Sequence, residues 1–202
     1  MDGTQAERPR QDAAAGEAAP GVRAFRTVGR ALLRQPRLLA WVAPVLWASL
    51  IFQLSSLEPR EAPLAFDTLG GLVTNLAHPA IFGVLALLIV PVLGRVRGED
   101  GRRWTSMSPE SSLWVVALVT LYGFTDELHQ STVEGRDASL LDVLSDFTGA
   151  LAVVLVVRFV GRADASDRGL RRALLLALLA SLAAAGLSTI WDRFIGDSPW
   201  PF

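Results

Sequence analysis

Long apolar segments are the feature that most constrains this chain. From residue 38 onwards the sequence holds five of them, at 38–54, 69–93, 113–130, 140–160 and 173–191. Each is near the ~20 residues that a helix needs to cross the hydrocarbon of a bilayer. A chain of 202 residues could by length form one soluble domain, but apolar blocks of this kind are typical of polytopic membrane proteins. We therefore predict an all-α integral membrane bundle with about five transmembrane helices.

The segments divide the chain into four parts. Residues 1–37 form a tail, which is predicted to be disordered to about residue 21 because it is rich in Ala, Gly, Pro and charge. Residues 38–161 form a four-helix membrane domain, residues 173–191 an additional helix, and residues 192–202 a short final tail. Pro44, Pro79 and Pro91 lie inside the first two spans. Membrane helices tolerate proline, and it is expected to kink them.

The second half of the N-terminal tail is basic. Arginines recur there every three or four residues, with Phe25, Val28 and Leu32 between them. This pattern predicts an amphipathic helix that lies on an anionic membrane surface. A solvated basic tail is the alternative interpretation, because such patterns are common.

Arginine also sets the predicted orientation. All 19 basic residues are arginines, and under a five-span topology 16 fall on one side and 3 on the other. The positive-inside rule then places the N-terminus in the cytoplasm and the C-terminus outside a bacterial cell membrane. The chain has neither lysine nor cysteine, which excludes Schiff-base chemistry, disulfides and cysteine zinc sites.

The third and fourth spans carry carboxylates, namely Asp126, Glu127, Asp142 and Asp146. At about 1.5 Å per residue, Asp126 lies roughly 7 Å, Asp146 roughly 9 Å and His78 roughly 13 Å from the outer ends of their helices. A charge at mid-membrane costs about 2.5–3.5 kcal/mol on insertion scales, so ionisable residues there are functional by default. The alternative is a polar lock that only fixes helix packing.

Helical spacing places these groups on shared faces. Asp126 and Gln130 are four residues apart, as are Asp142 and Asp146, while Gly149 extends the second face and permits close helix approach. The two helices should be antiparallel neighbours, with Arg136 in their loop close enough to bind one carboxylate as a two-pronged fork. His129 and Glu134 are expected to be interfacial. The predicted ligand-binding residues are Asn75, His78, Asp126, Glu127, Gln130, Arg136, Asp142 and Asp146, with His78, Asp126, Asp142 and Asp146 as candidate metal ligands.

The stretch "TDELHQSTVEGRDASLLDVLSDFTGA" resembles the central signature of the VanZ-like family of bacterial membrane proteins. The likeness rests on an Asp-Glu pair, a Gln, a loop Arg, and an Asp before a Gly on the next helix, and "WASLIFQLSSLEP" resembles the first family helix. It covers about residues 41–160. Asn75 and Phe82 stand where the family usually has Lys and Tyr, which puts any mechanism that needs those groups in doubt.

The resemblance implies a link to low-level resistance against glycopeptides of the teicoplanin type. We therefore expect a cell-envelope protein whose polar site in the outer leaflet binds a lipid-linked wall precursor or a glycopeptide. The alternatives are a metal- or acid/base-dependent enzyme acting on lipid head groups, a polar lock without chemistry and, last, a transporter. The lipid bilayer is the expected partner, no nucleic acid is expected, and no cofactor is evident.

Overall fold

The computed structural model describes residues 19–57, 68–94, 107–136 and 138–194. The secondary structure within these ranges is helical, and the predicted all-α fold is confirmed. The helices are α1 (Pro20–Leu33), α2 (Arg37–Ala40), α3 (Val42–Ser55), α4 (Thr68–Leu93), α5 (Pro109–Gln130), α6 (Leu140–Gly161) and α7 (Asp167–Phe194).

Four helical stretches in the described part of the chain are long and apolar enough to cross a membrane: Arg37–Ser55, Gly71–Leu93, Leu140–Gly161 and Asp167–Asp192. The expectation of about five spans is therefore close. α5 has 22 residues but does not qualify, because its last turns carry Asp126, Glu127 and Gln130. The chain is a multi-pass membrane protein, and its exposed leucines, such as Leu176 at 66% exposure, suit contact with lipid.

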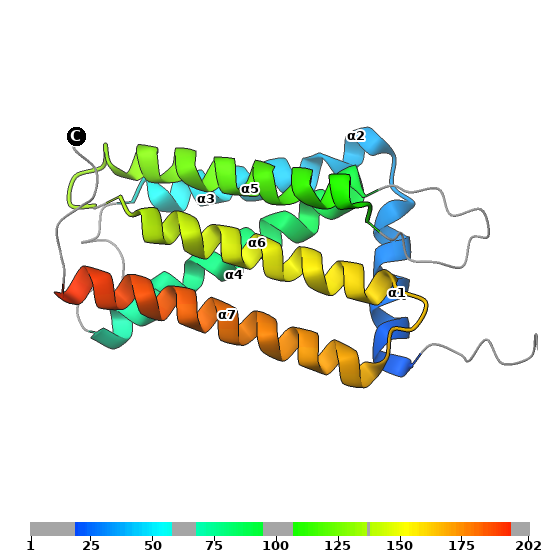
Figure 1. Ribbon diagram of the computed structural model, residues 1–202. Coiled ribbons are helices and arrows are strands. Elements are labelled where there is room, and N and C mark those ends of the chain that lie inside the picture. The colour runs from blue at the N-terminus through cyan, green and yellow to red at the C-terminus, as the bar shows by residue number, and fades with distance from the viewer. Residues whose placement is uncertain (1–18, 58–67, 95–106, 137, 195–202) are drawn as a thin grey trace, which may run out of the picture.

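The long helices run side by side as a bundle, and α1 lies across one end of it (Figure 1). α6 packs against α4, α5 and α7, and α3 lies against α4 and α5. We call the end that holds the α5–α6 connection, residues 131–139, the hairpin end. The opposite end, which α1 crosses, is the α1 end.

A close approach of α4 and α6 sits at the centre of the bundle. A Cβ added to Gly149 of α6 would collide with the backbone carbonyl of Pro79 in α4, so only glycine fits this contact. Apolar side chains from α3, α4, α5 and α6 form the main core, among them Ile51, Phe82, Val119 and Val154. Small residues allow helices to pack tightly where lipid supplies no hydrophobic drive for association.

α1 is docked on the connection between α6 and α7. The carboxylate of Asp167 accepts hydrogen bonds from the backbone amides of Gly21 and Val22, at 3.2 and 3.1 Å. Arg26 donates to the carbonyls of Val160 and Arg162 at 2.9 and 2.6 Å. The amphipathic helix predicted here is thus present, and its contact with a membrane surface stays a prediction.

The described arginines separate between the two ends of the bundle. Those of α1, of the turn that follows it, of the start of α2 and of the α6–α7 region lie at the α1 end, whereas Arg136 and Arg193, which is near the end of α7, lie at the hairpin end. Which end faces the cytoplasm stays a prediction. Most of the two predicted tails lies outside the described residues, as do Arg8, Arg10, Arg60, Arg95, Arg97, Arg102 and Arg103.

Candidate functional site

Polar side chains from several helices meet inside the bundle towards its hairpin end. We call six of them the polar cluster. Five are buried, with side chains from α5 and α6, and the sixth is a partly exposed histidine from α4. The members are His78, Asp126, Glu127, Gln130, Asp142 and Asp146. Since α4 and α6 start at the hairpin end while α5 finishes there, their antiparallel order brings together residues that are far apart in sequence.

Asp126 and Gln130 join α3 to α5. Ser55 Oγ of α3 donates to Asp126 Oδ1 at 2.6 Å, and Gln130 Nε2 donates to Asp126 Oδ2 at 3.0 Å. The same amide nitrogen also lies 3.2 Å from Glu127 Oε1. The predicted pairing of Asp126 with Gln130 on one helix face is therefore present. Ser55 is a partner that the sequence did not point to, although it lies in the quoted "FQLSS" stretch.

Glu127 is fully buried and holds the start of the next helix. Its Oε2 accepts from the backbone amide of Ser139 at 2.8 Å. Ser139 is the N-cap of α6, and its hydroxyl accepts from the amide of Leu141. One carboxylate and one hydroxyl thus satisfy two of the backbone amides that a helix start leaves without intrahelical partners.

Among the described residues, Arg136 donates to carbonyls and an amide and not to a carboxylate as predicted. Its Nε and Nη2 donate to the carbonyls of Leu57 and Leu54, at 2.9 and 3.1 Å, and its Nη1 donates to Gln130 Oε1 at 3.1 Å. These carbonyls belong to the end of α3, where the last backbone acceptors of a helix need partners. Arg136 therefore ties α3 to α5 and reaches the cluster only through Gln130.

His78 and Asp146 form a direct pair between α4 and α6. His78 Nδ1 lies 3.1 Å from Asp146 Oδ1, and the side chain of Asp146 has no exposed surface. Its Oδ2 has no hydrogen-bond partner among the described residues. Gly123 of α5 makes room for this oxygen, because a Cβ there would collide with it.

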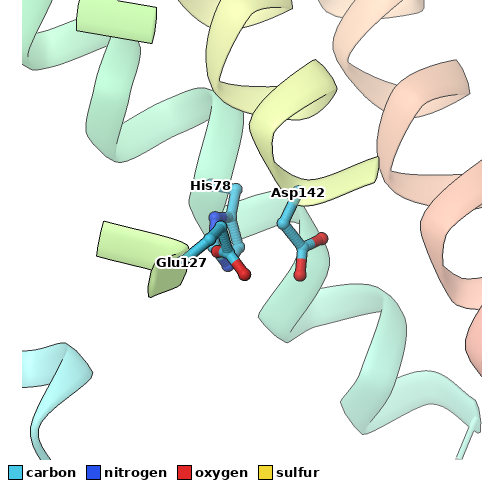
Figure 2. Close-up of side chains that lie close together, drawn as sticks. All are labelled: His78, Glu127 and Asp142. Carbon is cyan, nitrogen blue, oxygen red and sulfur yellow. The ribbon is translucent and has the colours of Figure 1, made fainter. Parts of the chain in front are cut away.

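Asp142 completes the cluster beside His78. Its Oδ1 accepts from the hydroxyl of Ser188, a buried residue of α7, at 2.7 Å. One side-chain atom each from His78, Glu127 and Asp142 lie within 4.8 Å of one another, and Figure 2 shows these three side chains projecting from three helices into one space. Two of the four predicted metal ligands, His78 and Asp142, belong to this group, and the other two, Asp126 and Asp146, do not. Its third member is Glu127, which was not predicted as a metal ligand.

Three other predicted residues lie apart from this space. The amide of Asn75 donates to Thr189 Oγ1 and Asp192 Oδ2 of α7, both at 3.1 Å. His129 is partly exposed, contacts the Ser56 hydroxyl at 2.9 Å and stacks on the ring of Phe52. Glu134 is exposed in the connection. The contacts from α7 were not predicted, because nothing in sequence spacing relates α7 to α4 or α6.

An apolar groove of about 330 Å³ lies on the α1-end side of the cluster, and its lining residues do not include any member of the cluster. It lies between α4, α6 and α7, and Phe25 of α1 lines it at the far end. Two of its lining residues are close to the cluster in sequence. Pro79 directly follows His78, and Gly149 comes three residues after Asp146. Polar cluster and apolar groove are therefore neighbours along α4 and α6.

Comparison with known protein families identifies the chain. The family model described as VanZ/LLP1 matches residues 23–161, which is more than half of the chain. The matched part runs from α1 to the end of α6 and contains the whole polar cluster, whereas Ser188, Thr189 and Asp192 of α7 lie beyond it. Neither the search of curated proteins nor the search of solved structures finds a match.

Proposed function

Because the chain belongs to the VanZ/LLP1 family, as its motifs predicted, we propose that it is a bacterial cell-envelope protein that binds a lipid-linked cell-wall precursor. The head group would lie at the polar cluster and the hydrocarbon chain in the apolar groove. The observation that carries this proposal is that cluster and groove are neighbours along α4 and α6.

An amphipathic ligand fits both parts. The groove follows α6 from Gly149 to Val160, about 16 Å at ~1.5 Å per residue, so it can hold an extended hydrocarbon chain. A chain that moves from lipid into this groove gains little, because lipid tails are as apolar as the side chains that line it. Selectivity must therefore come from the head group, where carboxylates, an imidazole and an amide can bind hydroxyl and amide groups.

Low-level resistance to teicoplanin-type glycopeptides would follow from this binding, since a precursor held in the protein is shielded from the drug. A glycopeptide bound directly at the cluster is the other ligand expected from the sequence. The groove favours the precursor, because a precursor brings a long hydrocarbon chain that lies in the bilayer beside the bundle.

Binding is tested with the full chain in lipid nanodiscs, to which a polyprenyl-linked disaccharide-peptide precursor is titrated. Ala152→Phe, which fills the groove from α6, should weaken binding at least about tenfold, equivalent to ~1.4 kcal/mol. Ala183→Phe is the matched control, because Ala183 is exposed on α7 away from the lining residues, and it should bind as the native chain does.

In cells, the native chain should raise the teicoplanin concentration needed to stop growth, and Ala152→Phe should not, at equal protein levels. Equal precursor binding by both Phe variants would contradict the groove assignment. Binding of teicoplanin but not of precursor by the purified protein would replace the precursor with the glycopeptide as ligand.

An enzyme that acts on lipid head groups is the second candidate function. The observation that favours it is His78 beside two buried carboxylates, an arrangement that can transfer protons. Incubation of the nanodisc protein with the precursor, followed by mass spectrometry of the lipid, separates the two candidates. A new product that Asp142→Asn does not form supports the enzyme, and recovery of intact lipid supports binding alone.

A further inference from the structure

We propose that His78, Glu127 and Asp142 bind a divalent transition-metal ion, with Asp146 as the positioning residue that orients the imidazole. The inference rests on the proposed function in taking the polar cluster as a ligand site, and it adds the ion through which a head group would be held. Three observations carry it.

The first observation is the grouping of donor atoms. His78 comes from α4, Glu127 from α5 and Asp142 from α6, and one ligand atom of each lies within 4.8 Å of the others (Figure 2). Ligand atoms around a tetrahedral ion lie about 3.4 Å apart when the metal bonds are ~2.1 Å long. To reach that distance the three donors would have to move closer together by rotation of their side chains.

The second observation is the pair formed by His78 and Asp146. A histidine that ligates a metal almost always donates its other ring N–H to a carboxylate or carbonyl, which sets the tautomer and the ring orientation. Nδ1 of His78 lies 3.1 Å from Asp146 Oδ1, so Nε2 is the nitrogen left for the ion.

The third observation is the charge. Glu127, Asp142 and Asp146 bring three carboxylates around one imidazole inside a membrane bundle, and the guanidinium of Arg136 donates to carbonyls and to Gln130 instead. Asp146 Oδ2 is buried without a partner among the described residues. Because buried carboxyl groups are protonated, paired or bound to a metal, a doubly charged ion is one partner that would satisfy this group of acids.

The donor set points to the class of ion. One imidazole nitrogen and two carboxylate oxygens suit Zn²⁺ and related first-row ions better than Mg²⁺ or Ca²⁺, which prefer oxygen alone. Three protein ligands leave the fourth position of a tetrahedral site open. A phosphate oxygen of a lipid head group is the chemistry that would complete it.

Zn²⁺ is the probe for the test. The full chain is purified in detergent, stripped with a chelator and titrated with Zn²⁺ by calorimetry, without any lipid precursor. We expect one ion per chain. His78→Gln, Glu127→Gln and Asp142→Asn should each weaken binding about 100-fold or more, whereas Asp146→Asn should weaken it about 10- to 100-fold, the range found for groups that orient a ligand.

The two histidines of the chain provide a matched control. His129→Gln should leave Zn²⁺ affinity unchanged, because His129 contacts Ser56 and Phe52 and is not in the group. X-ray absorption at the zinc edge should show one imidazole in the native chain and in Asp146→Asn, and none in His78→Gln. Thermal unfolding of each metal-free variant shows whether it is folded. If one of the three ligand variants is unfolded, the other two decide the outcome.

Failure to bind one Zn²⁺ per chain, or an equal loss with His129→Gln and His78→Gln, would overturn the inference. Precursor titrations with chelator and with Zn²⁺ separate it from the proposed function. Zn²⁺ binding without precursor binding keeps the metal site and removes the proposed function. If the precursor binds equally in both solutions and no Zn²⁺ is bound, the proposed function is kept and the metal site is removed.

Discussion

The hairpin end and the α1 end of the bundle are built from the same helices but are held together differently. At the hairpin end, Ser55, Ser139 and Ser188 each link a carboxylate to another segment. At the α1 end, α4, α6 and α7 line an apolar groove, and hydrogen bonds from α1 tie it to Asp167 at the start of α7 and to the end of α6. Lipid provides little hydrophobic drive for helix association, so hydrogen bonds and close packing must specify the arrangement.

The largest effect is expected at the joint between the two halves. Gly149→Val should destabilise the protein by about 3 kcal/mol or more, because the new side chain would collide with the backbone of Pro79, which cannot rotate away. Thermal unfolding in detergent measures this loss. Gly186→Val on α7 is the control, since Gly186 has open space around its Cβ position. An equal loss of stability in both variants would contradict the importance of the contact between Gly149 and Pro79.

The polar half is probed by Ser188→Ala. Removal of the hydroxyl leaves Asp142 Oδ1 buried without this donor, which should lower stability by about 1–3 kcal/mol. Ser49→Ala should change it little, because Ser49 is exposed and its hydroxyl bonds only within its own helix. Chemical denaturation compares the two. A polar lock predicts this loss of stability but no accompanying change in precursor or Zn²⁺ affinity.

Docking of α1 is probed by Asp167→Ala. Loss of the two hydrogen bonds from Gly21 and Val22 should destabilise α1 by about 1 kcal/mol, the usual value for a lost helix cap. Hydrogen exchange of the α1 amides should accelerate while exchange in α5 stays constant. An unchanged rate in α1 would show that Arg26 and apolar packing suffice.

The smallest effect is expected for Asp164→Asn in the α6–α7 connection. A side-chain hydrogen bond from Arg162 lowers the pKa of Asp164, so any stability it contributes is present above the unfolded pKa and is lost as pH falls through the folded pKa. Both side chains are more than half exposed, and we expect no resolvable change in Tm at neutral pH. A clear loss of Tm at neutral pH that disappears in acid would contradict this.

Much of the fold was predictable because hydropathy and helical spacing are local properties. The predicted spans agree with α4, α5 and α6 to within a few residues, although α5 carries enough acid to fall short of a membrane span by composition. α7 is longer than predicted, since it begins at Asp167, a charged residue whose role is to hold α1. The gathering of acids near one end of the bundle also followed from spacing along α5 and α6.

The partners of those acids were not predictable. Ser188 lies 46 residues from Asp142 in sequence, and Ser55 lies 71 residues from Asp126. Arg136 was expected on a carboxylate because opposite charges attract, but the end of α3 supplies carbonyl acceptors closer to it. Glu127 was predicted as a ligand-binding residue but not as a metal ligand, because its distance to His78 depends on how α4 and α5 pack.

The sequence by itself determined that this chain is a multi-pass helical membrane protein of the VanZ-like type with buried acids near one end, because apolar length, helical period and a local motif are enough for that. Only the tertiary structure decided which acid faces which partner. The lateral placement of helices depends on close contacts such as Gly149 on Pro79, which join residues from separate helices. That placement puts His78 beside carboxylates and sets an apolar groove next to the polar cluster along α4 and α6.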